Sequence, residues 1–284
     1  MKLYKRIIAK LDIKGPDLVK GIHLEGLRVL GSPNFFAKEY YNNSVDELIY
    51  QDVVASLYER KNLLDIINKT SKNIFIPLTV GGGLKSIEDI KMVLKVGADK
   101  ISINTAAVNN PKLINDAANT FGSSTIVVSI EASKNSNGDY MVFTENGREE
   151  TGKKAIDWAT EVVERGAGEL ILTSVEKEGT GSGFDIDFIN QVSSKIDIQI
   201  IANGGAGSKE HVFDLFNKTK TSAVAISSLL HYSILNKINN LEKKKLTGNT
   251  EFLKKKINNK NIKNCNIKEL KMYLKKKKIN TIEQ

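Results

Sequence analysis

Two clusters of glycine follow short apolar runs of the sequence, about 120 residues apart. The motif IPLTVGGG places the first cluster at residues 81–83, and IQIIANGGAG places the second at residues 204–207. Because glycine has no Cβ atom, a ligand can come close to the backbone, where exposed N–H groups bind anions. We therefore expect a phosphate group at each cluster.

Each glycine cluster is followed by a helical pattern and then by a second apolar run that ends in polar residues. In the first copy these residues are Asn104 and Thr105, and in the second they are Ser227 and Ser228. The repetition favours two phosphate sites related by an internal duplication, and a ligand that carries a phosphate at each end. The alternative is that the glycines only form turns, which a matched pair makes less favourable than a single cluster would.

Two acidic residues, Asp12 and Glu131, end the first and fifth apolar runs. Two carboxylates that face each other across a phosphate-binding mouth could act as general acid and base at the middle of the ligand. The alternative is that they bond to loop backbone or cap the turn that follows. Lys20 could contact a phosphate or cover the first loop. None of the three histidines lies at a strand end with a partner carboxylate at metal-ligand spacing, so we expect no metal and assign no cofactor.

The elements that must position these residues alternate along the chain. Strands and helices that alternate at roughly 30-residue spacing predict an α/β fold, a single (β/α)8 TIM barrel with an internal half-barrel duplication, over an open doubly wound sheet. Helical patterns cover residues 57–70, 87–96, 111–121, 155–165 and 210–216. Strand-like runs end near Asp12, Asp52, Val80, Ile103, Ala132, Ser174, Asn203 and Ile226.

A barrel of this kind carries its chemistry at the carboxyl ends of the strands. The first and fifth strands lie on opposite sides of the barrel, so Asp12 and Glu131 are expected to face each other at this end. Four charged residues fall at the opposite, amino ends of the strands: Arg6, Glu47, Lys100 and Glu169. Taken alone, such charges would most simply form a salt-bridged barrel floor.

The 284-residue chain has a formal net charge of +9, and this charge is unevenly distributed. Fifteen lysines and only four acidic residues follow residue 232, whereas the first 232 residues are slightly acidic. The lysine runs at 243–245, 254–256 and 275–278 lie among asparagines without an aromatic platform for stacking bases, so we expect no nucleic-acid binding. We divide the chain into a phosphate-binding barrel, residues 1–232, and a lysine- and asparagine-rich insertion with a closing C-terminal helix, residues 233–284.

Composition also indicates the compartment. No apolar run is long enough to span a bilayer, and no signal-type apolar segment follows the first residue. The single cysteine, Cys265, excludes an intrachain disulfide and fits a reducing environment. We expect a cytoplasmic protein without membrane contact.

Several motifs together resemble the cyclase subunit family of imidazole glycerol phosphate synthase, an enzyme of histidine biosynthesis. They are RIIAKLDIKGPDLVKG, VDELIYQDVVAS, IPLTVGGG, GADKISINTAAV, GAGELILTS, GTGSGFD and NGGAGSKEHV. The likeness covers residues 1–232 and resumes in the closing helix. It implies a barrel that combines ammonia with a bisphosphorylated ribulosyl aminoimidazole substrate, releasing imidazole glycerol phosphate and an aminoimidazole carboxamide ribotide.

The resemblance also implies roles for individual residues. Asp12 matches an acid-base aspartate at the end of the first strand. The residues that match the two phosphate sites are Gly83, Asn104 and Thr105 for one, and Gly179, Gly205 and Ser228 for the other. At the second site Ser227 stays open as an alternative to Ser228, because a shift of one residue in the match would select it.

The four charges at the lower end match a ring through which ammonia enters from a glutaminase partner, and Asp99 is a candidate contact with that partner. Thiol glutaminases need a cysteine paired with a histidine. Cys265 lies in the lysine-rich tail, away from every strand end, so the resemblance implies a separate glutaminase subunit.

Three positions depart from the family pattern. Glu131 and Glu178 replace aspartates, and Lys10 replaces a cysteine. Because strand side chains alternate, Lys10 shares the face of the first strand that carries Asp12. We expect Lys10 to point inward and to pair with Glu131. With these changes the chain also resembles a paralogous branch of the family, in which the barrel passes ammonia to a separate enzyme that amidates a surface sugar. A further alternative is a non-catalytic activator of a glutaminase. Another is the sister isomerase of the same pathway, but that enzyme needs no ammonia, so the complete lower ring argues against it.

Overall fold

The computed structural model describes residues 4–54, 57–235 and 261–282, with the side chains of residues 57–62 left out. Two of the lysine runs, at 243–245 and 254–256, lie outside the described residues, as does most of the segment 235–264, for which the sequence shows no family counterpart.

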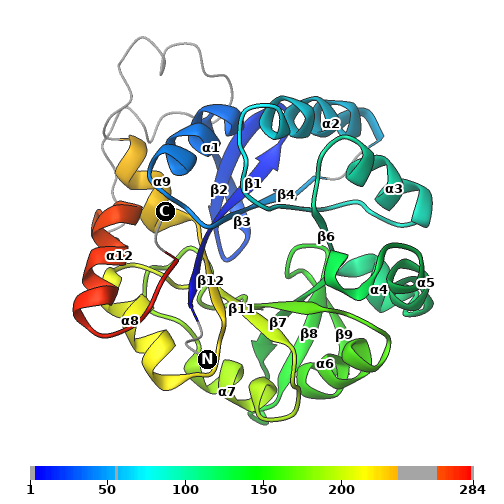
Figure 1. Ribbon diagram of the computed structural model, residues 1–284. Helices are drawn as coiled ribbons and strands as arrows, with labels where there is room; N and C mark the ends of the chain where they lie inside the picture. The colour runs from blue at the N-terminus through cyan, green and yellow to red at the C-terminus, as the bar shows by residue number, and fades with distance from the viewer. Residues whose placement is uncertain (1–3, 55–56, 236–260, 283–284) are drawn as a thin grey trace.

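Eight parallel strands close into a barrel surrounded by helices (Figure 1). The ring is closed because β12 pairs with β1 on one side and with β11 on the other. The predicted (β/α)8 barrel is therefore confirmed, and each strand ends within two residues of its expected end. The barrel strands are β1 (Arg6–Lys14), β4 (Glu47–Asp52), β5 (Leu78–Gly81), β6 (Lys100–Ile103), β7 (Ile126–Lys134), β10 (Glu169–Ser174), β11 (Gln199–Asn203) and β12 (Ala223–Ile226).

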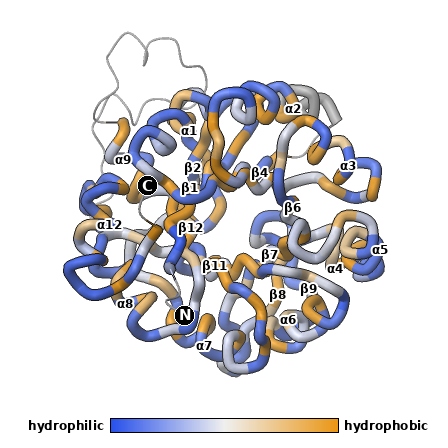
Figure 2. The backbone as a smooth tube through the Cα atoms, viewed as in Figure 1, coloured by the Kyte–Doolittle hydropathy of each residue, from blue (hydrophilic) through white to orange (hydrophobic). Residues whose placement is uncertain are grey.

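Helices cover the outside of the strands and turn their hydrophilic residues outward (Figure 2). All five helices predicted from periodicity are present, with ends shifted by one or two residues, whereas the sequence patterns do not predict α1, α4, α7 and α9. The helices are α1 (Pro33–Asn42), α2 (Leu57–Ser71), α3 (Ile87–Lys95), α4 (Thr105–Asn109), α5 (Lys112–Phe121), α6 (Ala155–Glu164), α7 (Ile186–Ser193), α8 (Lys209–Lys218), α9 (Ser228–Leu235) and α12 (Ile267–Lys276). None of the helices in these described ranges is both long and apolar enough to cross a membrane.

Helix α3 shows how the sequence starts a helix directly after the first glycine cluster. The Ser86 hydroxyl accepts a hydrogen bond from the Asp89 N–H at 3.1 Å, and the Asp89 carboxylate accepts one from the Ser86 N–H at 3.2 Å. This reciprocal cap satisfies two N–H groups that have no partner inside the helix. Ile90 and Val93 then fall on the buried face, so the helix packs against the barrel beside the glycine turn.

Two antiparallel hairpins interrupt the alternation of strands and helices. After β1 the chain forms β2 (Asp17–Ile22) and β3 (Glu25–Gly31), and after β7 it forms β8 (Tyr140–Thr144) and β9 (Glu149–Lys154). The strands β1 and β7 are the first and fifth of the barrel, so the hairpins occur at matching places in the two halves. This repetition supports the expected duplication, although the sequence patterns do not predict the hairpins themselves.

The barrel interior is layered because strand side chains alternate between inside and outside. On β1, Arg6, Ile8, Lys10 and Asp12 share the inward face. The apolar members of the interior form a separate buried cluster, away from the main core between strands and helices: Ile8, Ile49, Val127, Ile171, Ile201, Ala223 and Ala225. A charged floor below and polar residues above therefore enclose an apolar middle layer.

The C-terminal residues close the lower end of the barrel wall. Helix α12 packs against α8, and Thr281 forms a parallel bridge with Lys5 just before β1. Lys271 of α12 lies 2.6 Å from the buried carboxylate of Asp46, which also accepts a hydrogen bond from the Ile7 N–H at 2.6 Å. The predicted closing helix is thus joined to the first barrel strand.

Candidate active site

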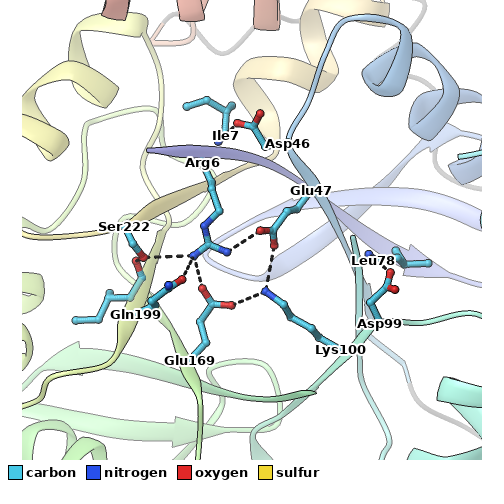
Figure 3. A network of polar contacts seen from close by, with 11 residues as sticks. Arg6, Ile7, Asp46, Glu47, Leu78, Asp99, Lys100, Glu169, Gln199 and Ser222 are labelled. Atoms are coloured by element: carbon cyan, nitrogen blue, oxygen red, sulfur yellow. Dashed lines mark hydrogen bonds and ion pairs between the residues drawn. The ribbon is translucent and has the colours of Figure 1, made fainter. Parts of the chain in front are cut away.

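The four charged residues at the amino ends of the strands form one ring (Figure 3). Arg6 Nη1 lies 2.6 Å from Glu47 Oε1, and Arg6 Nη2 contacts Glu169 Oε1. Lys100 Nζ completes the ring at 3.0 Å from Glu169 Oε2 and 3.4 Å from Glu47 Oε2. Each cation bridges both carboxylates, so the charges compensate one another in a partly desolvated setting.

Neighbouring residues hold this floor in place. Arg6 Nη2 also donates to the Gln199 side chain at 2.8 Å and to the Ser222 hydroxyl at 3.3 Å. Beside Lys100, the Asp99 carboxylate accepts a hydrogen bond of 2.8 Å from the Leu78 N–H, and both residues are drawn in Figure 3. Asp99 is exposed on the lower face, so its expected contact with a partner stays a prediction.

A second charged cluster lies above the apolar layer. Both oxygens of Asp12 are bound by ammonium groups: Lys10 Nζ is 2.5 Å from Oδ1, and Lys20 Nζ is 3.1 Å from Oδ2. Lys20 also contacts Glu178 Oε1, and Glu178 Oε2 is 3.5 Å from the Asn203 side-chain amide. All five residues are buried. Two positive and two negative side chains thus balance within one network.

This network sets the protonation state of Asp12. Burial alone would raise the pKa of Asp12, but the charges and hydrogen bonds of Lys10 and Lys20 outweigh burial and hold that pKa well below its usual range. For Lys20, burial would lower the pKa, and the carboxylates of Asp12 and Glu178 instead raise it. Asp12 is therefore ionised near neutral pH.

Glu131 lies in a different environment. Its Oε2 atom is buried and has no hydrogen-bond partner among the residues that the structure describes. Burial raises the pKa of Glu131 to about 7, against the opposing charge of Lys10 and a hydrogen bond from the Gly147 backbone. The nearby carboxylates of Glu178 and Asp12 raise it further. Asp12 and Glu131 are therefore two carboxyl groups with widely separated pKa values, as general acid-base pairs require.

The expected pairing of Lys10 with Glu131 is wrong. Lys10 does point into the barrel, but its ammonium group forms its ion pair with Asp12. Residues 10 and 12 share one face of β1, whereas Glu131 projects from β7 across the barrel. The neighbour on the same strand is close without any rearrangement of the chain, which explains the choice. Lys10 influences Glu131 only through its charge.

A cavity of about 720 Å³ opens at the carboxyl ends of the strands. Its wall includes Gly83 of the first glycine cluster, Asn104 and Thr105 after β6, and the Glu131 side chain. The first predicted phosphate site and one of the two carboxyl groups thus share one cavity. Asp12 does not line this cavity and lies in the buried lysine network.

The second glycine cluster forms a smaller and tighter recess. Gly179, Gly205, Ser227 and Ser228 line it, together with Glu178 and Asn203. The Ser227 hydroxyl donates to the Lys10 carbonyl at 2.8 Å, whereas Ser228 is the first residue of α9. Ser227 is therefore engaged with the barrel wall, which favours Ser228 as the residue of this pair that faces a ligand.

Several polar residues of the barrel interior were missed from the sequence. Ser102 and Ser129 line the large cavity, and within the described part of the chain the buried Ser102 hydroxyl has no hydrogen-bond partner. Thr173 accepts a hydrogen bond from the Asn203 side chain at 3.0 Å. The sequence does indicate that these residues point inward, because each stands two positions after an inward residue of the same strand. Ser102, for example, follows Lys100 by two residues.

Comparisons with known proteins identify relatives of this chain. A family model described as "Histidine biosynthesis protein" matches residues 6–236. A Legionella pneumophila protein named imidazole glycerol phosphate synthase subunit HisF is 55% identical over 205 residues, which cover 72% of this chain and 97% of the relative. Proteins with the same name from Alkaliphilus metalliredigens and Streptococcus sanguinis are 43% and 41% identical, each over 81% of this chain and 91% of the relative.

Proposed function

The chain belongs to the family of the imidazole glycerol phosphate synthase subunit HisF, and we propose that it is the cyclase of such a synthase. In this proposal, ammonia from a glutaminase partner enters through the charged floor. It reacts at the upper mouth with a ribulosyl aminoimidazole substrate that carries a phosphate at each end. The observation that supports this most strongly is the complete floor ring at one end of a barrel whose other end carries two glycine recesses.

The two recesses are suited to the two phosphates of one substrate. The larger cavity at Gly83, Asn104 and Thr105 would hold one phosphate, and the recess at Gly205 and Ser228 the other. Gly205 adopts a φ of 105°, and a Cβ atom there would lie 2.0 Å from the Gly183 carbonyl oxygen. Only glycine allows the backbone to approach this closely and present N–H groups to an anion.

The separated pKa values divide the proton transfers between the two carboxyl groups. When ammonia adds to the substrate carbonyl, the oxygen must gain a proton before it leaves as water, and the nitrogen must lose protons. Glu131, with a pKa of about 7, is placed in the cavity to give a proton to that oxygen. Asp12 is ionised, and each of its oxygens keeps a lone pair beside its lysine partner, with which it can accept a proton.

The lower face has features of a partner surface. Phe75 precedes β5 at the amino ends of the strands and is 77% exposed, next to a hollow lined by Pro77, Gly97 and Asp99. Such an exposed aromatic residue is typical of a binding anchor. Cys265 is buried, and burial raises the pKa of its thiol to about 11, so it is unsuited to act as a glutaminase nucleophile. Both observations favour a separate glutaminase that docks at the floor.

Reconstitution tests the cyclase directly. The purified chain, a glutaminase subunit, glutamine and the ribulosyl substrate should give imidazole glycerol phosphate, and the aminoimidazole product can be followed by its absorbance. Turnover should disappear in Asp12→Asn while the glutaminase is still stimulated. Stimulated glutaminase without any imidazole product from the native chain would instead favour the sugar-amidation branch, which the names of the relatives do not support.

A further inference from the structure

Residues 261–263 contact both of the loops that carry the glycines of the second recess. The Lys263 N–H donates a hydrogen bond of 2.8 Å to the Gly207 carbonyl, and the Asn261 side-chain amide donates one of 3.3 Å to the Thr180 carbonyl. The first bond reaches the loop after β11, and the second reaches the loop after β10. A single short segment, which we term the strap, therefore joins both loops that form the recess.

The contacts are close as well as bonded. A Cβ atom on Gly207 would lie 2.1 Å from the Gly181 carbonyl oxygen and 2.5 Å from the Asn261 carbonyl oxygen. A Cβ atom on Gly181 would lie 2.9 Å from the Ile262 side chain. The two loops are also joined directly, because the Gly183 N–H donates to the Gly205 carbonyl at 2.8 Å. The strap thus backs the recess where the two loops meet.

The strap has its own anchor in the fold. Cys265 is buried, and Asn266 begins α12 with a capping box, in which its side chain accepts from the Glu269 N–H at 2.9 Å. Helix α12 packs against α8, where the Phe213 and Tyr273 rings meet edge to face. The strap is therefore held between a packed helix and the recess.

The strap lies outside the part of the chain that the family model matches, which ends at residue 236. We propose that residues 261–263 are positioning residues of the second phosphate recess, which hold the loops after β10 and β11 in the geometry that binds one phosphate end of the substrate. This inference rests on the proposed function of the recess. It adds a support that comes from this chain's own C-terminal segment.

Substitutions that remove a single hydrogen bond of the strap test whether these bonds position the recess. Lys263→Pro removes the N–H that bonds to Gly207, whereas Lys263→Ala keeps that N–H and serves as the matched control. Asn261→Ala removes the bond to Thr180 more mildly, and Asn264→Ala is its control. In Lys263→Pro and Asn261→Ala we expect faster hydrogen exchange at residues 204–207. We also expect a KM for the bisphosphate substrate raised about threefold to tenfold, with kcat nearly unchanged.

A measurement with inorganic phosphate is independent of the reaction. Phosphate should slow hydrogen exchange at residues 204–207 in the native chain and in both controls, and less so in the two strap variants. If phosphate has this effect on hydrogen exchange but the native chain does not turn over the substrate, the positioning role of the strap is supported and the proposed cyclase activity is refuted. Unchanged exchange and KM in folded Asn261→Ala and Lys263→Pro would overturn the strap. So would equal effects in Lys263→Ala, or a lower melting temperature without any change at the recess.

Discussion

Lys10 Nζ lies 2.5 Å from Asp12 Oδ1, two residues further along the inward face of the same strand. The pair stands above the apolar layer, and Glu131 projects toward it from the opposite side of the barrel. Lys10 therefore acts on both carboxyl groups, through an ion pair with Asp12 and through its charge on Glu131. Its removal should change both.

Replacement of this lysine tests its electrostatic role. In Lys10→Gln the positive charge that lowers the pKa of Glu131 is lost, so that pKa should rise above about 7. The alkaline limb of the kcat/KM profile should then move to higher pH, because Glu131 keeps its proton longer. Lys95→Gln, on the exposed side of α3, is the control and should leave the limb in place. A limb that moves to lower pH would contradict the assignment.

The pH dependence of the native enzyme tests Glu131 itself. Below its pKa of about 7 the carboxyl group is protonated and can act as an acid. Above pH 7, kcat/KM should fall about tenfold per pH unit, and Glu131→Gln should lower it by about two to four orders of magnitude and flatten the limb. Glu131→Asp keeps an ionisable group and should keep a limb. The same limb in Glu131→Gln would assign it to another residue.

Neutralising Asp12 should affect both activity and stability. Asp12→Asn leaves the buried ammonium group of Lys10 without its carboxylate partner, which should cost about 3–5 kcal/mol in the free energy of unfolding. Denaturant titration measures this loss. Asp214→Asn, in an exposed pair with Lys218, is the control and should change stability by less than about 1 kcal/mol. Equal stability of the two variants would show that the buried network does not depend on Asp12.

The floor ring can be tested by the fate of the ammonia. Lys100→Met removes one of the two cations that bridge Glu47 and Glu169. We expect less imidazole product per glutamine hydrolysed, because the entry from the partner is disturbed, whereas turnover with added ammonium salt should be preserved. Both reactions are measured side by side, with Lys112→Met in an exposed pair as the control. An unchanged ratio of product to glutamate would argue against a role of the ring in ammonia transfer.

The lower face can be tested by partner affinity. Phe75→Asp places a charge where an exposed aromatic ring would be buried against the glutaminase, and should weaken binding about tenfold or more. Titration calorimetry or a glutaminase-stimulation curve measures the change. Met272→Asp is a control on α12, where the side chain is also exposed. Equal affinity of both variants would place the partner elsewhere.

Much of the architecture follows from local patterns. The strand ends and five helices could be predicted because apolar periodicity and glycine turns are local properties of the sequence. The hairpin strands β2 and β3 were missed because glycines and charged residues interrupt their alternation. Helix α7 was missed because it is short, and its N-cap Asp185 also binds Tyr140 from a distant strand.

The sequence by itself determined which residue types stand at each end of the barrel, since strand alternation and the position of each residue along its strand decide this. Only the tertiary structure decided how those residues pair. The Asp12 carboxylate, for example, binds Lys20 as well as Lys10, and Lys20 also contacts Glu178; these two partners come from a hairpin and from the loop after β10. Ion pairs between elements so far apart in the sequence depend on distances that only folding sets, and so no local pattern could assign them.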